Sequence, residues 1–234
     1  NISYEQLMQL IDMGYMQELS PKRIAQILPG YICIRSSLPK GKDTFNSDLL
    51  LKREITLKEH IWYLFEQESS IGYHNDRAQT AYKEGTTSRD ESFSAAFYRF
   101  SLDGHLDRNQ LLRATLSTFN RSFKKDMVNW FAGLFEELQP RAEELISLQE
   151  EIMQVFTSPY TKPVNVMLQQ LKKIASEGGF HYQEFIECAT TLFFSSPKNS
   201  LLTIYSIFEQ IVTGHPRNER SMLHPTLPTI PKER

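Results

Sequence analysis

The sequence is poor in glycine, and its glycines form no phosphate-binding motif. Ten glycines occur among 234 residues, which is about 4% against a usual 7%. No two have the G-x-G-x-x-G spacing, and none precedes Lys-Ser or Lys-Thr. Rossmann and P-loop sites need such loops to bring backbone N–H groups up to phosphates. H-E-x-x-H and G-x-S-x-G are also missing, so no common catalytic signature is present.

Cysteine, long apolar runs and an excess of one charge are missing as well. The two cysteines, Cys33 and Cys188, lie far apart, which is typical of free thiols in a reducing, cytoplasmic compartment. Apolar runs such as 61–65 are much shorter than the roughly 20 residues that cross a bilayer, and the first residues do not resemble a signal peptide. We therefore expect no membrane partner. Because Asn1 begins the chain without a Met, we expect a fragment or a processed form.

Helical periodicity is what the sequence has in abundance. Apolar residues recur every three to four positions along most of the chain, which predicts an all-α protein of about 9–10 helices. Capping boxes at Thr56–Glu59 and Ser88–Glu91 are expected to open two of these helices. Further helices are expected to begin behind three N-cap residues, which are Ser3, Ser20 and Asp107.

Three segments interrupt this pattern and suggest a division of the chain. Residues 29–54 look irregular with one short strand near 31–35, and the polar segment 70–90 is expected to be a loop around a short helix. The tail contains four prolines and is expected to be a linker or an extended strap along the surface. The predicted regions are therefore 1–90 (N-terminal helices with the irregular segment 29–54), 91–213 (helical repeat) and 214–234 (tail).

A weak internal repeat points to the architecture of these helices. Phe100–Leu112 recurs in residue type 74 positions later as Ile174–Ile186. Each copy ends one helix near a glycine and starts an amphipathic helix a few residues later. Gly104, Gly178 and Gly214 are expected at positive φ behind helices. A period of this length fits four helices, and it predicts a HEAT/armadillo-like α-solenoid of stacked antiparallel helix pairs.

Three segments also carry a family resemblance. Phe100–Leu116, Trp130–Phe131, and Glu137–Pro140 followed by Glu143 and Glu144 resemble an uncharacterised bacterial family of HEAT-like helical-repeat proteins. The resemblance covers roughly residues 90–213. It implies a stack of helix pairs and brings with it neither an activity nor catalytic residues.

The residues most suggestive of chemistry have simpler interpretations. Asp103, His105 and Asp107 have an alternation that metal ligands can show, but the intervening glycine favours a helix end followed by an N-cap. The trio 74–76 is interpreted as a solvated loop, and Cys188 as a small side chain on an apolar helix face. We therefore expect no catalytic, cofactor-binding or metal-binding residues and no cofactor.

A local charge imbalance supplies the candidate contact residues. Residues 107–126 are basic and 136–151 are acidic, although such runs often lie on solvated helix faces. If the basic cluster contacts a partner or a phosphate, the candidates are Arg113, Arg121, Lys124 and Lys125. We expect a non-enzymatic protein–protein interaction or scaffold module that binds a protein or peptide. A nucleic-acid-associated module is the alternative, and an enzyme with a site assembled from scattered residues is less favoured.

Overall fold

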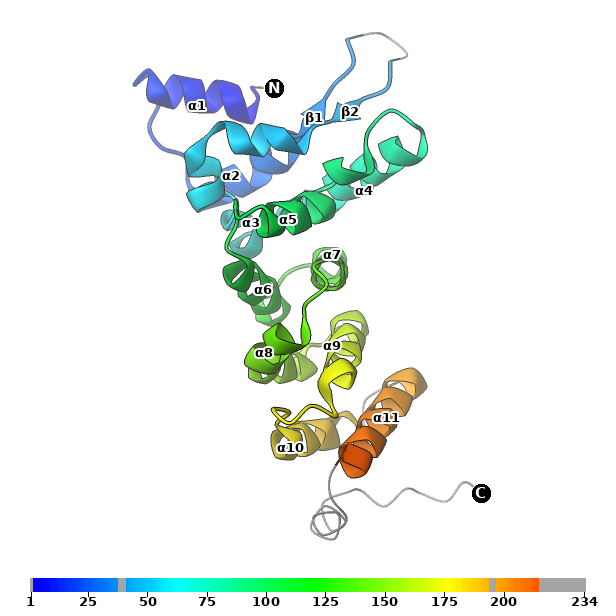
Figure 1. Ribbon diagram of the computed structural model, residues 1–234. Coiled ribbons are helices and arrows are strands. Elements are labelled where there is room, and N and C mark those ends of the chain that lie inside the picture. Colours follow the sequence, from blue (N-terminus) through cyan, green and yellow to red (C-terminus); the bar gives the residue numbers. More distant parts are fainter. Residues whose placement is uncertain (1, 38–40, 194–196, 215–234) are drawn as a thin grey trace. The chain divides into compact units, whose positions relative to one another are not determined.

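The protein forms two compact helical units. The computed structural model describes residues 2–37, 41–193 and 197–214 (Figure 1). The described chain is mostly helical, which confirms the all-α prediction. The first unit is Asn1–Gln139 and the second is Pro140–Arg234. Their boundary falls inside the predicted 91–213 region, and helices on either side of position 90 pack together within the first unit. The predicted tail, 214–234, lies outside the described residues except for its first residue.

The first unit contains seven α-helices among its described residues, together with short 3-10 and π-helical turns. The α-helices are α1 (Tyr4–Asp12), α2 (Pro21–Ile27), α3 (Tyr63–Glu66), α4 (Ile71–Lys83), α5 (Phe93–Leu102), α6 (Arg108–Ser117) and α7 (Lys125–Glu137). The 3-10 turns are Leu28–Gly30, Ser47–Lys52, Arg89–Glu91 and Thr118–Asn120, and the π-helical turn is Thr56–His60. Strands β1 (Cys33–Ile34) and β2 (Thr44–Phe45) pair antiparallel, with Cys33 opposite Phe45. The strand expected near 31–35 is therefore present but shorter.

The second unit contains four α-helices in its described part. These are α8 (Ala142–Gln154), α9 (Thr161–Ile174), α10 (Tyr182–Leu192) and α11 (Lys198–Gly214), with a 3-10 turn at Val155–Thr157. Its core centres on Phe185, whose ring lies 5.7 Å from the rings of Phe180 and Phe208 and 6.2 Å from that of Phe156. Helix α9 packs against both α8 and α11.

A cluster of aromatic rings forms the centre of the first unit. The Phe65 ring lies 5.8 Å from that of Phe97 and 5.3 Å from that of Phe131, and Phe97 also contacts Phe93 at 5.8 Å. All four side chains are buried. Burying one such side chain contributes about 1.5–3 kcal/mol, so this cluster holds α3, α5 and α7 together.

The three predicted N-cap residues begin helices as expected. Ser3 and Gln6 form a capping box at α1, and the Ser20 hydroxyl accepts from the Arg23 N–H at 3.3 Å. Asp107 Oδ1 accepts from the Gln110 N–H at 2.6 Å at the start of α6. Each side chain satisfies a donor that the first turn of a helix leaves without a partner.

Two predicted capping boxes are wrong because their residues have tertiary partners. The Thr56 hydroxyl is fully buried and bonds the Tyr4 hydroxyl at 2.7 Å, so the chain enters a π-helical turn without a side-chain cap. Ser88 precedes a 3-10 turn and makes no capping bond, while Glu91 bonds Ser47. Helix α5 begins four residues later than expected, behind the Ser92 hydroxyl.

The polar segment 70–90 is predicted as a loop around a short helix, but the structure has a helix of 13 residues there, α4. The buried face of α4 consists of Ile71, Asn75, Ala78 and Ala81. Asn75 is buried because its Oδ1 accepts from the Ser94 N–H at 3.0 Å. The trio 74–76 therefore lies on a helix, and its interpretation as a solvated loop is wrong. Small and polar residues carry the helical period here, so a search for large apolar residues misses it.

The glycine predictions hold for one of the two positions that can be compared. Gly104 has φ of 78°, and the Phe100 carbonyl accepts from both the His105 and Leu106 N–H groups, which is a helix end that needs a left-handed residue. Gly178 is not at positive φ, because the link from α9 to α10 turns through a Phe180 N–H to Glu177 carbonyl bond. Gly214 is the last residue of α11, and its φ stays a prediction.

Candidate functional site

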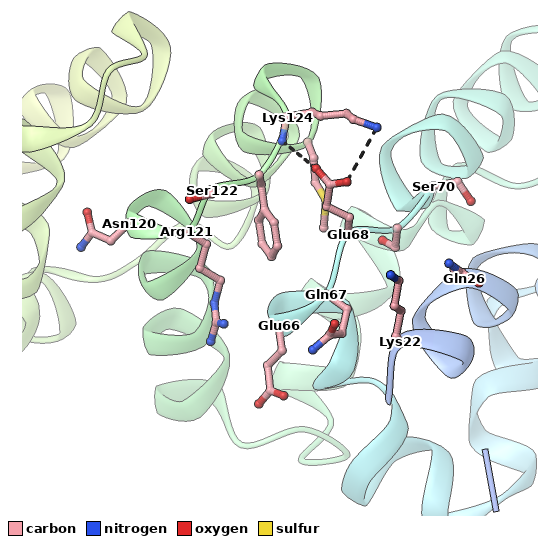
Figure 2. A pocket seen from close by; sticks show the side chains of 13 residues that line it. Lys22, Gln26, Glu66, Gln67, Glu68, Ser70, Asn120, Arg121, Ser122 and Lys124 are labelled. Carbon is pink, nitrogen blue, oxygen red and sulfur yellow. Dashed lines mark hydrogen bonds and ion pairs between the residues drawn. The ribbon is translucent and has the colours of Figure 1, made fainter. Parts of the chain in front are cut away.

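A groove in the first unit brings together side chains from four parts of the chain. Its volume is about 820 Å³, and Figure 2 shows its polar lining. We call it the α2–α7 groove. It is lined by Lys22 and Gln26 of α2, by residues 66–70 from the end of α3 to the residue before α4, by residues 120–124 before α7, and by Met127.

Local folding signals position these side chains. The Ser20 cap and Pro21 start α2, which places Lys22 in its first turn. The 3-10 turn Thr118–Asn120 ends α6, and the chain then becomes extended at Arg121. Phe123 and Met127 are each only 7% exposed and form the apolar part of the lining. The groove is therefore a polar rim around a small apolar floor.

The charges of this groove are mostly uncompensated. Glu68 Oε1 accepts from the Lys124 backbone N–H at 3.2 Å, and Glu68 Oε2 lies 3.7 Å from Lys124 Nζ. The Lys124 side chain is 84% exposed, so this ion pair contributes little stability. Figure 2 shows Lys22 and Arg121 on opposite sides of residues 66–68. Neither has an ionic partner within the described part of the chain, and both remain available to a ligand.

The structure brings together two of the four predicted contact residues. Arg121 and Lys124 line the α2–α7 groove, whereas Arg113 and Lys125 do not. Arg113 Nε donates to Asn109 Oδ1 at 2.9 Å along α6, and Lys125 is exposed at the start of α7. Lys22 was missed, because no sequence signal links α2 to the segment before α7.

A second groove of about 690 Å³ lies along the outward face of α5. We call it the α4–α5 groove. Its lining comes from the end of α4, the 3-10 turn before α5, and α5 itself, with Glu137 and Gln139 at the end of α7. Gln139 is the non-glycine residue with positive φ, 48°, in the described chain. Its carbonyl accepts from Arg108 at 3.2 Å, which helps to hold this unusual backbone.

A buried hydrogen-bonded cluster attaches α1 to the π-helical turn. The Tyr4 hydroxyl lies 2.7 Å from both Thr56 Oγ1 and His60 Nδ1. Burial raises the pKa of Tyr4 and lowers that of His60. Both side chains are therefore neutral near pH 7. Because π-helical turns often occur at functional sites, this cluster is a candidate for one. None of these three residues lines either groove, so we interpret the cluster as structural.

The neighbouring carboxylates complete the attachment of α1. Glu5 accepts from Arg53 Nη2 at 2.8 Å and from the Tyr31 hydroxyl at 2.9 Å, and Asp12 accepts from Arg53 Nη1 at 2.6 Å. The bonds from Arg53 lower the pKa of Glu5. Burial and the Glu5 carboxylate together raise the pKa of Tyr31. One arginine therefore joins both ends of α1 to the rest of the unit.

The sequence trio Asp103, His105 and Asp107 does not converge. Asp107 caps α6, Asp103 is the C-cap of α5, and the His105 ring packs edge-on against Phe100 at 5.9 Å. Across the described ranges, no three His, Cys, Asp or Glu side chains are grouped as a metal site requires. Cys188 is half-buried with a raised pKa caused by burial, which keeps the thiol protonated and unreactive near neutral pH.

Comparisons with known proteins define the family and leave the activity open. No helix among the described residues is both long and apolar enough to cross a bilayer. The curated proteins and the solved structures contain no match to this chain. A family model described as a domain of unknown function matches residues 1–199, which is most of the chain and includes the whole first unit. The chain therefore belongs to the family of this domain of unknown function, DUF6493.

Proposed function

We propose that this chain is a non-enzymatic interaction module built on a HEAT-like helical repeat, and that its α2–α7 groove holds an extended segment of a partner protein. The observation that carries the proposal is the lining of this groove, which places two unpaired cations and several amide side chains around an apolar floor. A bacterial cytoplasmic protein of this kind fits the free thiols and the family resemblance.

The order of helices in the two units supports the repeat. The first residues of α6 and α10, Arg108 and Tyr182, are 74 positions apart, and the first residues of α7 and α11, Lys125 and Lys198, are separated by nearly the same number. In each unit the third helix from the end also contacts the last helix: α5 contacts α7, and α9 contacts α11. Stacked helix pairs present long surfaces that suit peptide segments.

The side-chain chemistry of the α2–α7 groove favours an extended peptide. Gln26, Gln67 and Asn120 line it, and a carboxamide can both donate to a main-chain carbonyl and accept from a main-chain N–H. An extended segment leaves those groups unpaired, since it has no internal hydrogen bonds. The floor of Phe123 and Met127 can cover one apolar side chain, and a methionine adapts to different shapes.

The charges favour an acidic side chain on that segment. Lys22 and Arg121 extend from opposite sides of the groove, so a carboxylate between them gains a charge-assisted hydrogen bond from either one. Glu66 and Glu68 lie between the two cations. The two carboxylates repel a nucleic-acid backbone, which carries a negative charge at every nucleotide, more strongly than a peptide with one or two carboxylates. We therefore favour a protein partner over nucleic acid.

Peptide selection with the full chain tests this function. A random 12-residue phage-displayed library is selected on the wild-type protein, and the dissociation constants of the enriched peptides are then measured for the wild type and for the variants. We expect enriched sequences with acidic residues, whose dissociation constants rise at least tenfold in K22E/R121E and less than twofold in R113E/K125E. Arg113 and Lys125 are the matched control, because they belong to the same basic cluster but lie outside the groove.

Two results would overturn the proposal. One is the selection of peptides that bind K22E/R121E as tightly as the wild type, since their site is then elsewhere. The other is binding of single-stranded RNA or DNA that weakens steeply between about 50 and 200 mM salt and is lost in R113E/K125E, which indicates contacts to phosphates along the basic cluster.

A further inference from the structure

Helix α5 has a second apolar stripe, which faces outward. Its inward stripe is Phe93, Ala96, Phe97 and Phe100, all fully buried in the first unit. An amphipathic helix needs only one such stripe to join a core. The outward stripe, Ala95, Tyr98 and Leu102, follows the i, i+3, i+7 spacing and lines the α4–α5 groove.

The outward stripe is partly accessible, since Ala95 and Tyr98 are half-buried and Leu102 is exposed. Leu102 is 60% exposed, and Tyr82 of α4, which lines the same groove, is 48% exposed. Large apolar side chains grouped in a groove, unlike scattered ones, are typical of a binding surface. Helix α5 has ten residues and is therefore about 15 Å long. Its three outward apolar residues match the contact face of another helix of about three turns.

The two ends of the α4–α5 groove have opposite charges. Lys83, the last residue of α4, and Arg89, in the turn that leads into α5, lie at the N-terminal end of α5 beside Asp90. Asp103, directly behind α5, and Glu137, at the end of α7, lie at its C-terminal end. Among the described residues none of these four has an ion-pair partner, so with Asp90 counted the first end is net basic and the second end is acidic.

Arg99 does not disturb this polarity. It lies in the middle of α5, and its guanidinium donates to Asp48 at 2.7 Å and to the Ser47 hydroxyl at 3.0 Å. Its charge is therefore compensated inside the first unit. The gradient along the groove comes from its two ends.

We infer that the α4–α5 groove binds an amphipathic helix of another protein, with its acidic first turn against Lys83 and Arg89 and its basic last turn against Asp103 and Glu137. Helices commonly carry acidic residues at the start and basic residues at the end, because both complement the helix dipole. Such a helix lies parallel to α5 and covers Tyr82, Tyr98 and Leu102. The site is separate from the α2–α7 groove and does not depend on it.

A designed peptide tests this site on the full chain. The probe is a stapled, end-blocked, fluorescent helix of about 14 residues, with Leu at i, i+4 and i+7, Glu in the first turn, Lys in the last turn and Ala and Gln elsewhere. The control peptide has Gln in place of these Glu and Lys residues. Fluorescence anisotropy is expected to show at least tenfold tighter binding of the first peptide, and K83E/R89E, which makes both ends of the groove acidic, is expected to abolish this preference.

Single variants locate the contact. L102D is expected to weaken binding at least tenfold, whereas L202D, at a residue 57% exposed on α11, should change it less than twofold. K22E/R121E should leave it unchanged, which separates this inference from the function proposed for the α2–α7 groove. Circular dichroism checks that each variant is folded, as expected for exposed positions.

Three outcomes would overturn the inference. Equal binding of the two peptides shows that the charged ends of the groove do not contribute to binding. Full binding to L102D places the peptide elsewhere. Sedimentation that shows a wild-type dimer and an L102D monomer makes a second copy of this chain, and not a partner helix, the occupant of the face.

Discussion

Removal of the Tyr4 hydroxyl should destabilise the first unit. Tyr4 is 1% exposed, and its hydroxyl lies 2.7 Å from both Thr56 Oγ1 and His60 Nδ1. In Y4F the ring keeps its place beside Tyr31, at a centroid distance of 4.9 Å. Only the hydroxyl is lost, and two buried polar atoms lose a partner.

The expected loss follows from the burial of those two atoms. Thr56 is fully buried and His60 is 8% exposed, so water cannot readily replace the missing hydroxyl. Leaving such groups unpaired costs about 1–3 kcal/mol, and each 1.4 kcal/mol is about tenfold in the folding equilibrium. With a urea dependence of about 1–3 kcal/mol per molar, the midpoint should fall by roughly 1 M.

Tryptophan fluorescence measures this change in the first unit alone. Both tryptophans, Trp62 and Trp130, lie in that unit, so urea unfolding followed at their emission does not report on residues 140–234. Y15F is the control, since Tyr15 is 77% exposed and should change stability by less than about 0.5 kcal/mol. If Y4F is as stable as Y15F, the cluster does not hold α1 in the way we describe.

Three further predictions concern stability. Burial lowers the pKa of His60 below its ordinary 6.5, so the stability that the neutral imidazole contributes is complete above pH 6.5 and is lost as the pH falls below it. The urea concentration at the unfolding midpoint should therefore be lower at about pH 5 than at about pH 7. H60Q should flatten this part of the pH profile. S92A should lose about 1 kcal/mol through the α5 cap, whereas S88A, which removes no capping bond, should lose almost nothing in the same urea assay; equal losses would contradict the helix start at Phe93. G104A, at φ of 78°, should lose about 1–2 kcal/mol and lower the melting temperature seen by calorimetry, while G178A, with open space around its Cβ position, should not.

The α2–α7 groove shows how far a candidate site could be predicted. Arg121 and Lys124 were identified because they lie close together in a basic stretch, and both line the groove. Lys22 and Glu66 lie in other elements, and nothing local connects them to residues 120–124. Arg113 belongs to the same basic stretch but bonds Asn109 on its own helix. A run of like charges identifies a region, and the packing of α2, α3 and α7 selects which of its members share a groove.

Local order was determined by the sequence itself. The caps Ser3, Ser20 and Asp107 and the left-handed Gly104 act within a few residues of themselves, so their roles follow from local backbone hydrogen bonding. Tertiary structure alone decided that Thr56 and Glu91 bond Tyr4 and Ser47 in place of capping helices. It also decided that residues 71–83 form a helix, α4, with one face buried. In each case a distant residue satisfies a polar group more fully than a near neighbour does, and burial makes that difference large.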